Sequence, residues 1–248
     1  MDKNTILYVI IALLAGFIGG FLLASSMNRS EINALRGQGG RQTSQPAQGN
    51  QSNPQDQTLS EAELKAKIDE ADKSPSNFAF QKDLGIALYR YAAMKQDVTI
   101  LNEAQRILER ANSLNGRDFD VLVALGNSHF DIAFDKKDGT GFQKAREIYA
   151  DALRVRPDDA DVQTDIGISY FWQPSPDYNK AVTTLEKVSA ANPMQTRSMQ
   201  YLARSYIKLG KFADAEKTIA KIKNIDPNAA GMAELNSELT AAKSGNSQ

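Results

Sequence analysis

An uncharged apolar stretch, residues 5–24, lies close to the start of the chain and follows a short polar tail at 1–4. Its 20 residues would span roughly 30 Å as a helix, which matches the hydrocarbon core of a bilayer. The pattern therefore predicts a transmembrane anchor over residues 5–27. A cleaved signal peptide is the alternative, because Ala24 and Ser26 are small residues where a peptidase would cut.

Small residues recur at every fourth position of this stretch and would form one stripe along a helix: Ala12, Gly16, Gly20 and Ala24. Such a stripe lets two helix backbones approach closely in lipid, so it predicts a homodimer through the membrane segment. The alternative is that Gly and Ala are simply common in membrane helices.

Basic residues flank the stretch on both sides, with Lys3 before it and Arg29, Arg36 and Arg41 after it. This charge bias slightly favours the bulk of the chain on the cytoplasmic side. A short tail followed by one uncleaved helix is, however, a common way to display a domain outside the cytoplasm. We expect a single-pass protein of a bacterial inner membrane with its folded domain outside the cytoplasm, and the orientation stays open.

The following residues, 28–58, are rich in Gln, Gly, Ser, Asn and Pro and almost lack large apolar side chains. They cannot bury enough surface to fold, so they predict a flexible linker. A capping box at Ser60 and Glu63 then indicates the start of a leading capping helix, at 59–75.

A pattern of apolar and small positions recurs four times between residues 76 and 228. Each unit has a large residue followed by a small one, at Leu84-Gly85, Leu125-Gly126, Ile166-Gly167 and Leu202-Ala203. Three residues after the small one lie Leu88, His129, Tyr170 and Tyr206, and an alanine opens a second apolar segment at Ala104, Ala145, Ala181 and Ala215. Gly116, Pro157, Pro193 and Pro227 close the units. Small residues let two helices of a hairpin touch, and Pro or Gly ends the second helix.

This pattern resembles the tetratricopeptide repeat. The resemblance implies an all-α solenoid over residues 76–228, built of about four helix-turn-helix repeats. Their approximate limits are 76–116, 117–157, 158–193 and 194–227, and we expect a C-terminal capping helix and tail at 229–248.

The first two repeats are longer than the family spacing. Gly85 and Ala104 are 19 residues apart, as are Gly126 and Ala145, whereas Ala203 and Ala215 are 12 apart, which is the family value. The difference of 7 residues is close to two helical turns. We therefore predict longer hairpins whose faces stay in phase.

Composition narrows the functional classes. The net charge of −1, from 29 basic and 30 acidic residues, gives no electrostatic support for binding nucleic acid. The chain has no cysteine and a single histidine, His129. This composition excludes most side-chain arrangements that bind metals or catalyse reactions. The acidic run Asp158-Asp159-Asp161 is better explained as a cap for a helix starting near Ala160. We expect no cofactor, no metal and no enzymatic activity.

The resemblance further implies that the first helices of the repeats line a concave groove that binds a protein or peptide. The positions implied are Lys82, Ile86, Tyr89, Val123, Asn127, Phe130, Thr164, Ile168, Phe171, Gln200, Arg204 and Ile207. Most of these are apolar or aromatic, so we predict a partner that docks as an apolar or amphipathic helix. Arg197 and Arg204 would then meet an acidic group of that partner near the C-terminal end.

The leading functional hypothesis is a membrane-anchored scaffold or adaptor. A more specific alternative is a membrane-bound assembly chaperone, similar in architecture to the factor that holds apocytochromes in c-type cytochrome biogenesis.

Overall fold

The computed structural model describes residues 60–245, and in this part of the chain it contains ten α-helices and no strand. The predicted all-α fold is therefore confirmed for these residues. The helices are α3 (Glu61–Lys73), α4 (Phe78–Lys95), α5 (Val98–Leu114), α6 (Phe119–Lys136), α7 (Gly139–Val155), α8 (Ala160–Trp172), α9 (Tyr178–Ala191), α10 (Thr196–Lys208), α11 (Phe212–Ile225) and α12 (Met232–Gly245).

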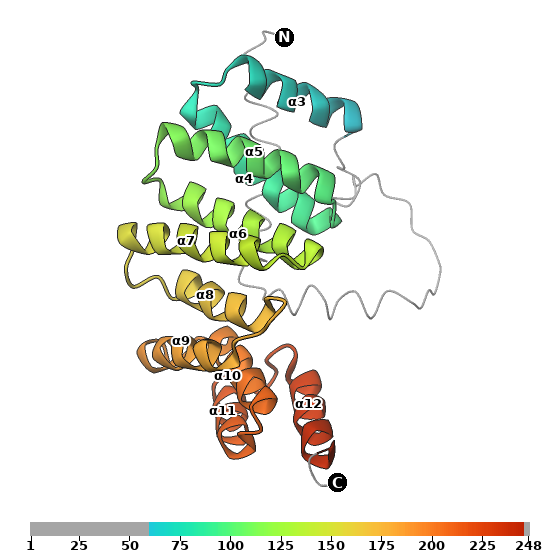
Figure 1. Cartoon of the computed structure of the whole chain (residues 1–248), viewed down its shortest axis with the longest axis vertical. Helices are drawn as coiled ribbons and strands as arrows, with labels where there is room; N and C mark the ends of the chain where they lie inside the picture. The colour runs from blue at the N-terminus through green and yellow to red at the C-terminus, as the bar shows by residue number, and fades with distance from the viewer. Residues whose placement is uncertain (1–59, 246–248) are drawn as a thin grey trace, which may run out of the picture.

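Helices α4 to α11 form four hairpins, each made of a first helix and a second helix that pack together (Figure 1). Each second helix also contacts the first helix of the next hairpin, so the hairpins stack along the long axis of the molecule. Consecutive first helices touch as well: α4 contacts α6, α6 contacts α8, and α8 contacts α10. This is the stacked arrangement that the four sequence repeats predict.

The predicted anchor (5–27), with its stripe of small residues, and the predicted linker (28–58) lie outside the described residues. Within residues 60–245, no helix is both long enough and apolar enough to cross a membrane.

Acidic side chains define where many of the helices begin. Asp159 caps α8 by accepting the backbone N–H of Val162 at 2.9 Å, as the sequence predicted. Ser60 and Glu63 form the predicted capping box: the Ser60 N–H donates to Glu63 Oε2 at 2.9 Å, and the Glu63 N–H donates to Ser60 Oγ at 3.3 Å. Asp97, Asp118, Asp138 and Asp177 cap α5, α6, α7 and α9 in the same way. These carboxylates satisfy backbone donors that a helix cannot pair internally.

The predicted difference in hairpin length is confirmed. The first helices α4 and α6 have 18 residues each, whereas α8 and α10 have 13. The second helices α5 and α7 have 17 residues, whereas α9 and α11 have 14. The last turns of α6 consequently extend beyond the length that α8 offers beside them.

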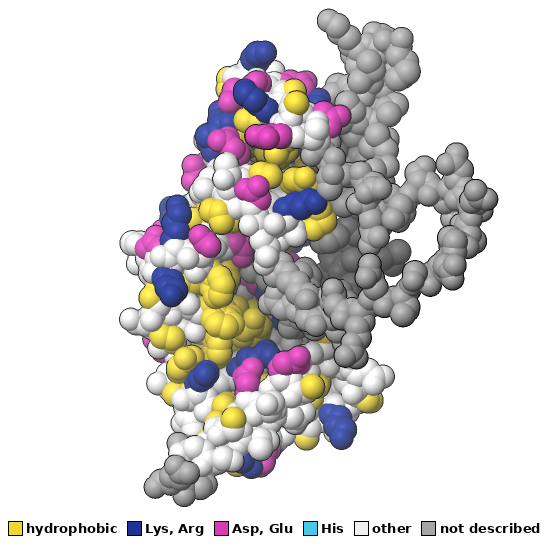
Figure 2. Space-filling view, turned by 90° about the vertical axis from the view of Figure 1, so that its right-hand side faces the viewer, with side chains coloured by type: hydrophobic (Ala, Val, Ile, Leu, Met, Phe, Trp, Pro, Cys, Tyr) yellow, Lys and Arg dark blue, Asp and Glu magenta, His cyan; other side chains and the backbone are white. Residues whose placement is uncertain are grey.

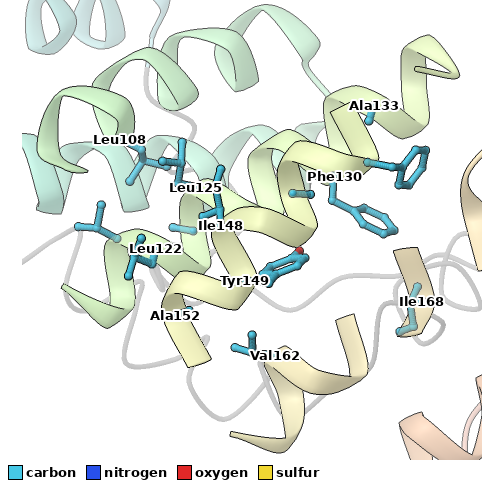
Figure 3. Close-up of a cluster of buried hydrophobic side chains, with 14 of the residues drawn as sticks. Leu108, Leu122, Leu125, Phe130, Ala133, Ile148, Tyr149, Ala152, Val162 and Ile168 are labelled. Atoms are coloured by element: carbon cyan, nitrogen blue, oxygen red, sulfur yellow. The ribbon is translucent and has the colours of Figure 1, made fainter. Parts of the chain in front are cut away.

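At the small positions of the first three repeats, the second helix of the hairpin leaves no room for a Cβ. A Cβ added to Gly126 would lie 2.5 Å from the ring of Tyr149, and one added to Gly167 would lie 2.6 Å from the side chain of Leu185. Tyr149 is fully buried, and its hydroxyl donates to Asn127 Oδ1 at 2.7 Å. Figure 3 shows Leu122 and Leu125 of α6 beside Ile148 and Tyr149 of α7 in this core.

The leading helix α3 is held to the first hairpin by polar contacts. Gln81 is fully buried, and its amide nitrogen donates to the carbonyl oxygens of Ala71 at 2.8 Å and Ser74 at 2.9 Å. Arg106 and Arg110 of α5 bind the carboxylate of Asp72 at 2.6 and 2.8 Å. Hydrogen bonds from Arg106 and then Arg110 lower the pKa of Asp72 from 3.8 to about 2.

This contact gives an expected pH dependence. The pKa of Asp72 is lower in the folded state, so the carboxylate stabilises the fold fully above about pH 4, and this contribution disappears as the pH falls towards 2. Because the Asp72 side chain is 42% exposed, solvent screening limits the contribution to about 1 kcal/mol or less. Thermal unfolding of wild type and Asp72→Asn should differ at pH 5 and converge near pH 2. A constant difference across this range would contradict the assignment.

The C-terminal helix α12 packs on α10 and α11 through Leu235 and Leu239, which are buried. Within the predicted C-terminal capping segment, 229–248, the helix begins only at Met232, after Gly231, which adopts a φ of 74°.

Candidate functional site

The predicted groove residues lie on the first helices α4, α6, α8 and α10, and many of them join one first helix to the next. On α4, the ammonium group of Lys82 binds the carboxylates of Asp118 at 2.8 Å and Asp120 at 3.0 Å. Burial acts to lower the pKa of Lys82, but the hydrogen bonds to the two carboxylates outweigh it and raise this pKa. Lys82 is therefore committed to a contact within the protein.

Other predicted residues of the first two repeats are also engaged within the protein. The Tyr89 hydroxyl donates to Asp131 of α6 at 3.1 Å, and Asn127 accepts the Tyr149 hydroxyl. Ile86 and Val123 are partly buried and pack against the main core cluster.

Several predicted residues are buried between helices: Phe130, Thr164, Ile168, Phe171, Gln200 and Ile207. Phe130 packs edge to face on Phe142 of α7, with ring centroids 5.1 Å apart. The Thr164 hydroxyl lies 2.9 Å from Gln195 Oε1, and the Gln200 amide donates to the carbonyl oxygen of Ala230 at 2.7 Å. These side chains therefore contribute to packing within and between the repeats.

The two arginines expected to meet an acidic partner already bind carboxylates of this chain. Arg197 pairs with Asp165 of α8. Arg204 pairs with Glu238 of α12 at 3.1 Å, and its guanidinium lies 5.5 Å from the ring centroid of Tyr201. An acidic group of a partner would have to share these arginines with the internal carboxylates.

Two exposed aromatic rings, Phe134 and Trp172, meet where α6 extends past α8, and with the partly buried Tyr201 we name them the aromatic ledge. The side chains of Phe134 and Trp172 are 49% and 42% exposed, and their rings meet edge to face with centroids 5.3 Å apart. The indole N–H of Trp172 donates to the Tyr201 hydroxyl at 3.3 Å. Figure 2 shows hydrophobic side chains gathered at about mid-height on one face of the molecule.

Phe134 was not among the predicted site residues. Its exposure follows from the unequal lengths of α6 and α8, because the last turn of α6 has no full turn of α8 to cover it. The longer spacing in the second repeat was visible in the sequence and is the signal that points to this position.

Within residues 60–245, no group of His, Cys, Asp and Glu side chains is arranged to hold a metal ion. His129 packs between helices, where the amide nitrogen of Gln105 lies 2.8 Å from its Nδ1. Burial, and secondarily the charge of Lys144, lower the pKa of His129. Both features are those of a packed side chain.

Comparisons with known proteins agree with this geometry. A tetratricopeptide repeat family model matches residues 176–238. A crystal structure of MamA is similar with a TM-score of 0.52 and 21% identity, over 66% of this chain and 87% of that chain. A MamA structure from Desulfovibrio magneticus has a TM-score of 0.53 and 15% identity, over 67% of this chain and 85% of that one. A thermophilic TPR protein of Thermus thermophilus has a TM-score of 0.52 and 17% identity, over 72% of this chain and 96% of that one. At these identities the structural likeness concerns the fold. No curated protein matches the sequence.

Proposed function

We propose that this chain, which carries a tetratricopeptide repeat and has the fold of that family, is a scaffold that binds a partner protein through an apolar or amphipathic helix. The partner lies against the first helices, with the aromatic ledge as its main anchor. The apolar segment 5–27 holds the protein at a membrane, with the folded domain outside the cytoplasm.

The observation that carries this proposal is the aromatic ledge. Phe134 and Trp172 are large apolar side chains that remain substantially exposed although they contact each other. Aromatic residues in such settings are enriched among those that dominate binding energy at protein interfaces. Their rings are also held in place, since Trp172 packs on Phe171 with centroids 5.1 Å apart. A rigid anchor loses little side-chain entropy on binding.

Within the described residues, no observation specifically favours apocytochromes as the partner. The chaperone alternative therefore stays a hypothesis from architecture, and the proposal concerns a protein partner in general.

The test places a photo-reactive amino acid at position 134 of the full-length protein in its own membrane. We expect cross-linked protein adducts, and we expect Trp172→Ala to reduce their yield at limiting partner concentration. Loss of an aromatic anchor typically costs about 2 kcal/mol, which corresponds to a roughly 30-fold weaker affinity.

Met194 provides the matched control, because its side chain is 72% exposed and lies in the turn before α10, outside the aromatic ledge. A photo-reactive residue at position 194 should give few adducts, and Met194→Ala should leave the adducts at 134 unchanged. Melting temperatures of both alanine variants show that the folded fraction is comparable. Equal adducts at both positions, or adducts at 134 that do not depend on Trp172, would refute the proposed anchor.

A further inference from the structure

We call the contact between a second helix and the helix that follows it a junction. Equivalent positions of the repeats lie at each of the four junctions. One position is the residue after the repeat alanine: Gln105, Arg146, Val182 and Glu216. Four residues later, on the same face of the helix, lie Glu109, Ala150, Glu186 and Ala220. His129, Tyr170 and Tyr206 face these positions from the first helix of the next repeat. The charges at the four junctions can therefore be compared directly.

Three junctions pair a carboxylate with a polar group of the neighbouring helix. At the first junction, Glu109 Oε1 lies 3.6 Å from His129 Nε2. At the third junction, the Tyr206 hydroxyl donates to Glu186. At the fourth junction, Lys243 of α12 pairs with Glu216.

The second junction, between α7 and α8, has a cation without a carboxylate in ion-pair contact. Arg146 lies over the ring of Tyr170, with its guanidinium carbon 4.4 Å from the ring centroid, and donates to Ser169 Oγ at 3.2 Å. Among residues 60–245, no carboxylate forms an ion pair with it, and burial lowers the pKa of its guanidinium. Ala150, which is exposed, stands where the first and third junctions have a glutamate.

Two carboxylates, Asp177 and Glu147, lie close enough for their charges to raise the pKa of Arg146, but their hydrogen bonds and ion pairs are with other groups. Glu147 accepts from Gln143 at 3.2 Å and lies 3.5 Å from the ammonium group of Lys144. Asp177 caps α9 by accepting the Lys180 N–H at 2.9 Å, and it pairs with the Lys180 ammonium group at 3.3 Å. Lys180 also lies 5.5 Å from the Tyr170 ring centroid and adds a second positive charge to the junction.

We infer that the α7–α8 junction is a recognition site for a carboxylate, supplied by an Asp or Glu side chain of a partner protein. The inference rests on the proposed scaffold function and adds a second contact point to it. A guanidinium presents paired N–H donors that fit the two oxygens of a carboxylate, and Arg146 has such donors in a fixed orientation over Tyr170. The partner's carboxylate takes the place that a glutamate of the chain itself fills at the first and third junctions.

The test uses ¹⁵N-labelled full-length protein and a glutamate residue blocked at both ends as the probe, with blocked glutamine as the neutral control at the same ionic strength. The Nε–Hε resonance of Arg146 is assigned by its loss in Arg146→Gln. We expect this resonance to shift with blocked glutamate and to stay in place with blocked glutamine. Binding should be weak, with a Kd on the order of 10 mM or higher, because one charge-assisted contact contributes only about 1.5–3 kcal/mol.

Substitutions at position 150 distinguish binding at this site from nonspecific attraction of the blocked glutamate to positive charge. Ala150→Glu supplies the missing carboxylate four residues after Arg146, so it should shift the resonance without any probe and remove the response to blocked glutamate. Ala150→Gln has nearly the same size without charge and should keep the response. The inference is overturned if the resonance does not move, or if Ala150→Glu responds as wild type does.

The two proposals fail in different ways. If the protein is no scaffold, adducts at position 134 are missing whatever happens at Arg146. If only the carboxylate site is wrong, those adducts persist at wild-type yield in Ala150→Glu. If both proposals hold, Ala150→Glu lowers the affinity for the partner at least about fivefold, since the new glutamate occupies one of the two contact points.

Discussion

Gly126→Ala should lower the melting temperature of the protein strongly, although alanine is normally the better helix former by about 1 kcal/mol. The added Cβ would lie 2.5 Å from the ring of Tyr149. This ring is fully buried, and its hydroxyl is bonded to Asn127, so it has little freedom to move away. Overpacking of a core of this kind costs about 1–3 kcal/mol, and the rigid ring places the expected loss at the upper end. Urea and thermal unfolding followed by circular dichroism measure it.

Two controls isolate the steric cause. Gly139→Ala, at the start of α7, has no atom within 4 Å of the added Cβ and should leave stability unchanged or raise it. Combining Gly126→Ala with Tyr149→Ile recreates the Ala203 and Ile219 pair of the fourth repeat. The double variant should lose less stability than the sum of the single losses. A wild-type melting curve for Gly126→Ala would contradict the close contact.

Phe142→Ala should produce the largest loss of stability, at about 3–5 kcal/mol. The side chain is fully buried in the main cluster, and its ring meets that of Phe130 edge to face at an interplanar angle of 83°. Removing it leaves a cavity between α6 and α7 and withdraws the support of Phe130. The midpoint of urea unfolding measures the change.

Phe134→Ala removes the same kind of side chain from an exposed position on the same pair of helices. Because Phe134 is half exposed, this change should cost less than about 1 kcal/mol. It should instead weaken partner binding at the ledge. Similar losses of stability for the two variants would show that Phe134 belongs to the core and would remove the basis of the ledge.

The concave groove illustrates the limit of inference from repeat positions. The positions implied by the family resemblance put Phe130 and Phe171 on first helices. Both residues lie there, but only 5% of each is exposed. Exposure depends on what the other helices present: Phe142 of the same hairpin covers Phe130, and Tyr201 of the next hairpin covers Phe171. The repeat positions alone do not indicate which side chains cover these two rings.

The arginines show the same limit for charge. Arg197 and Arg204 are adjacent to acidic residues only after folding, since Asp165 is 32 residues away and Glu238 is 34 residues away along the chain. Pairing over such distances depends on how far each hairpin is rotated relative to the next. The lack of an ion-paired carboxylate at Arg146 could not be recognised until the four junctions were compared in space.

The sequence by itself determined the repeated hairpins, their unequal lengths and many of their starting points. These features depend on contacts within one hairpin or within a few residues, such as Gly126 against Tyr149 or Asp159 at the start of α8. Only the tertiary structure decided which first-helix residues stay exposed and which charges are already paired. Those properties depend on packing between helices. A difference of a few residues in the lengths of α6 and α8 uncovers Phe134, and the alanine at position 150 leaves Arg146 without an ion-paired carboxylate.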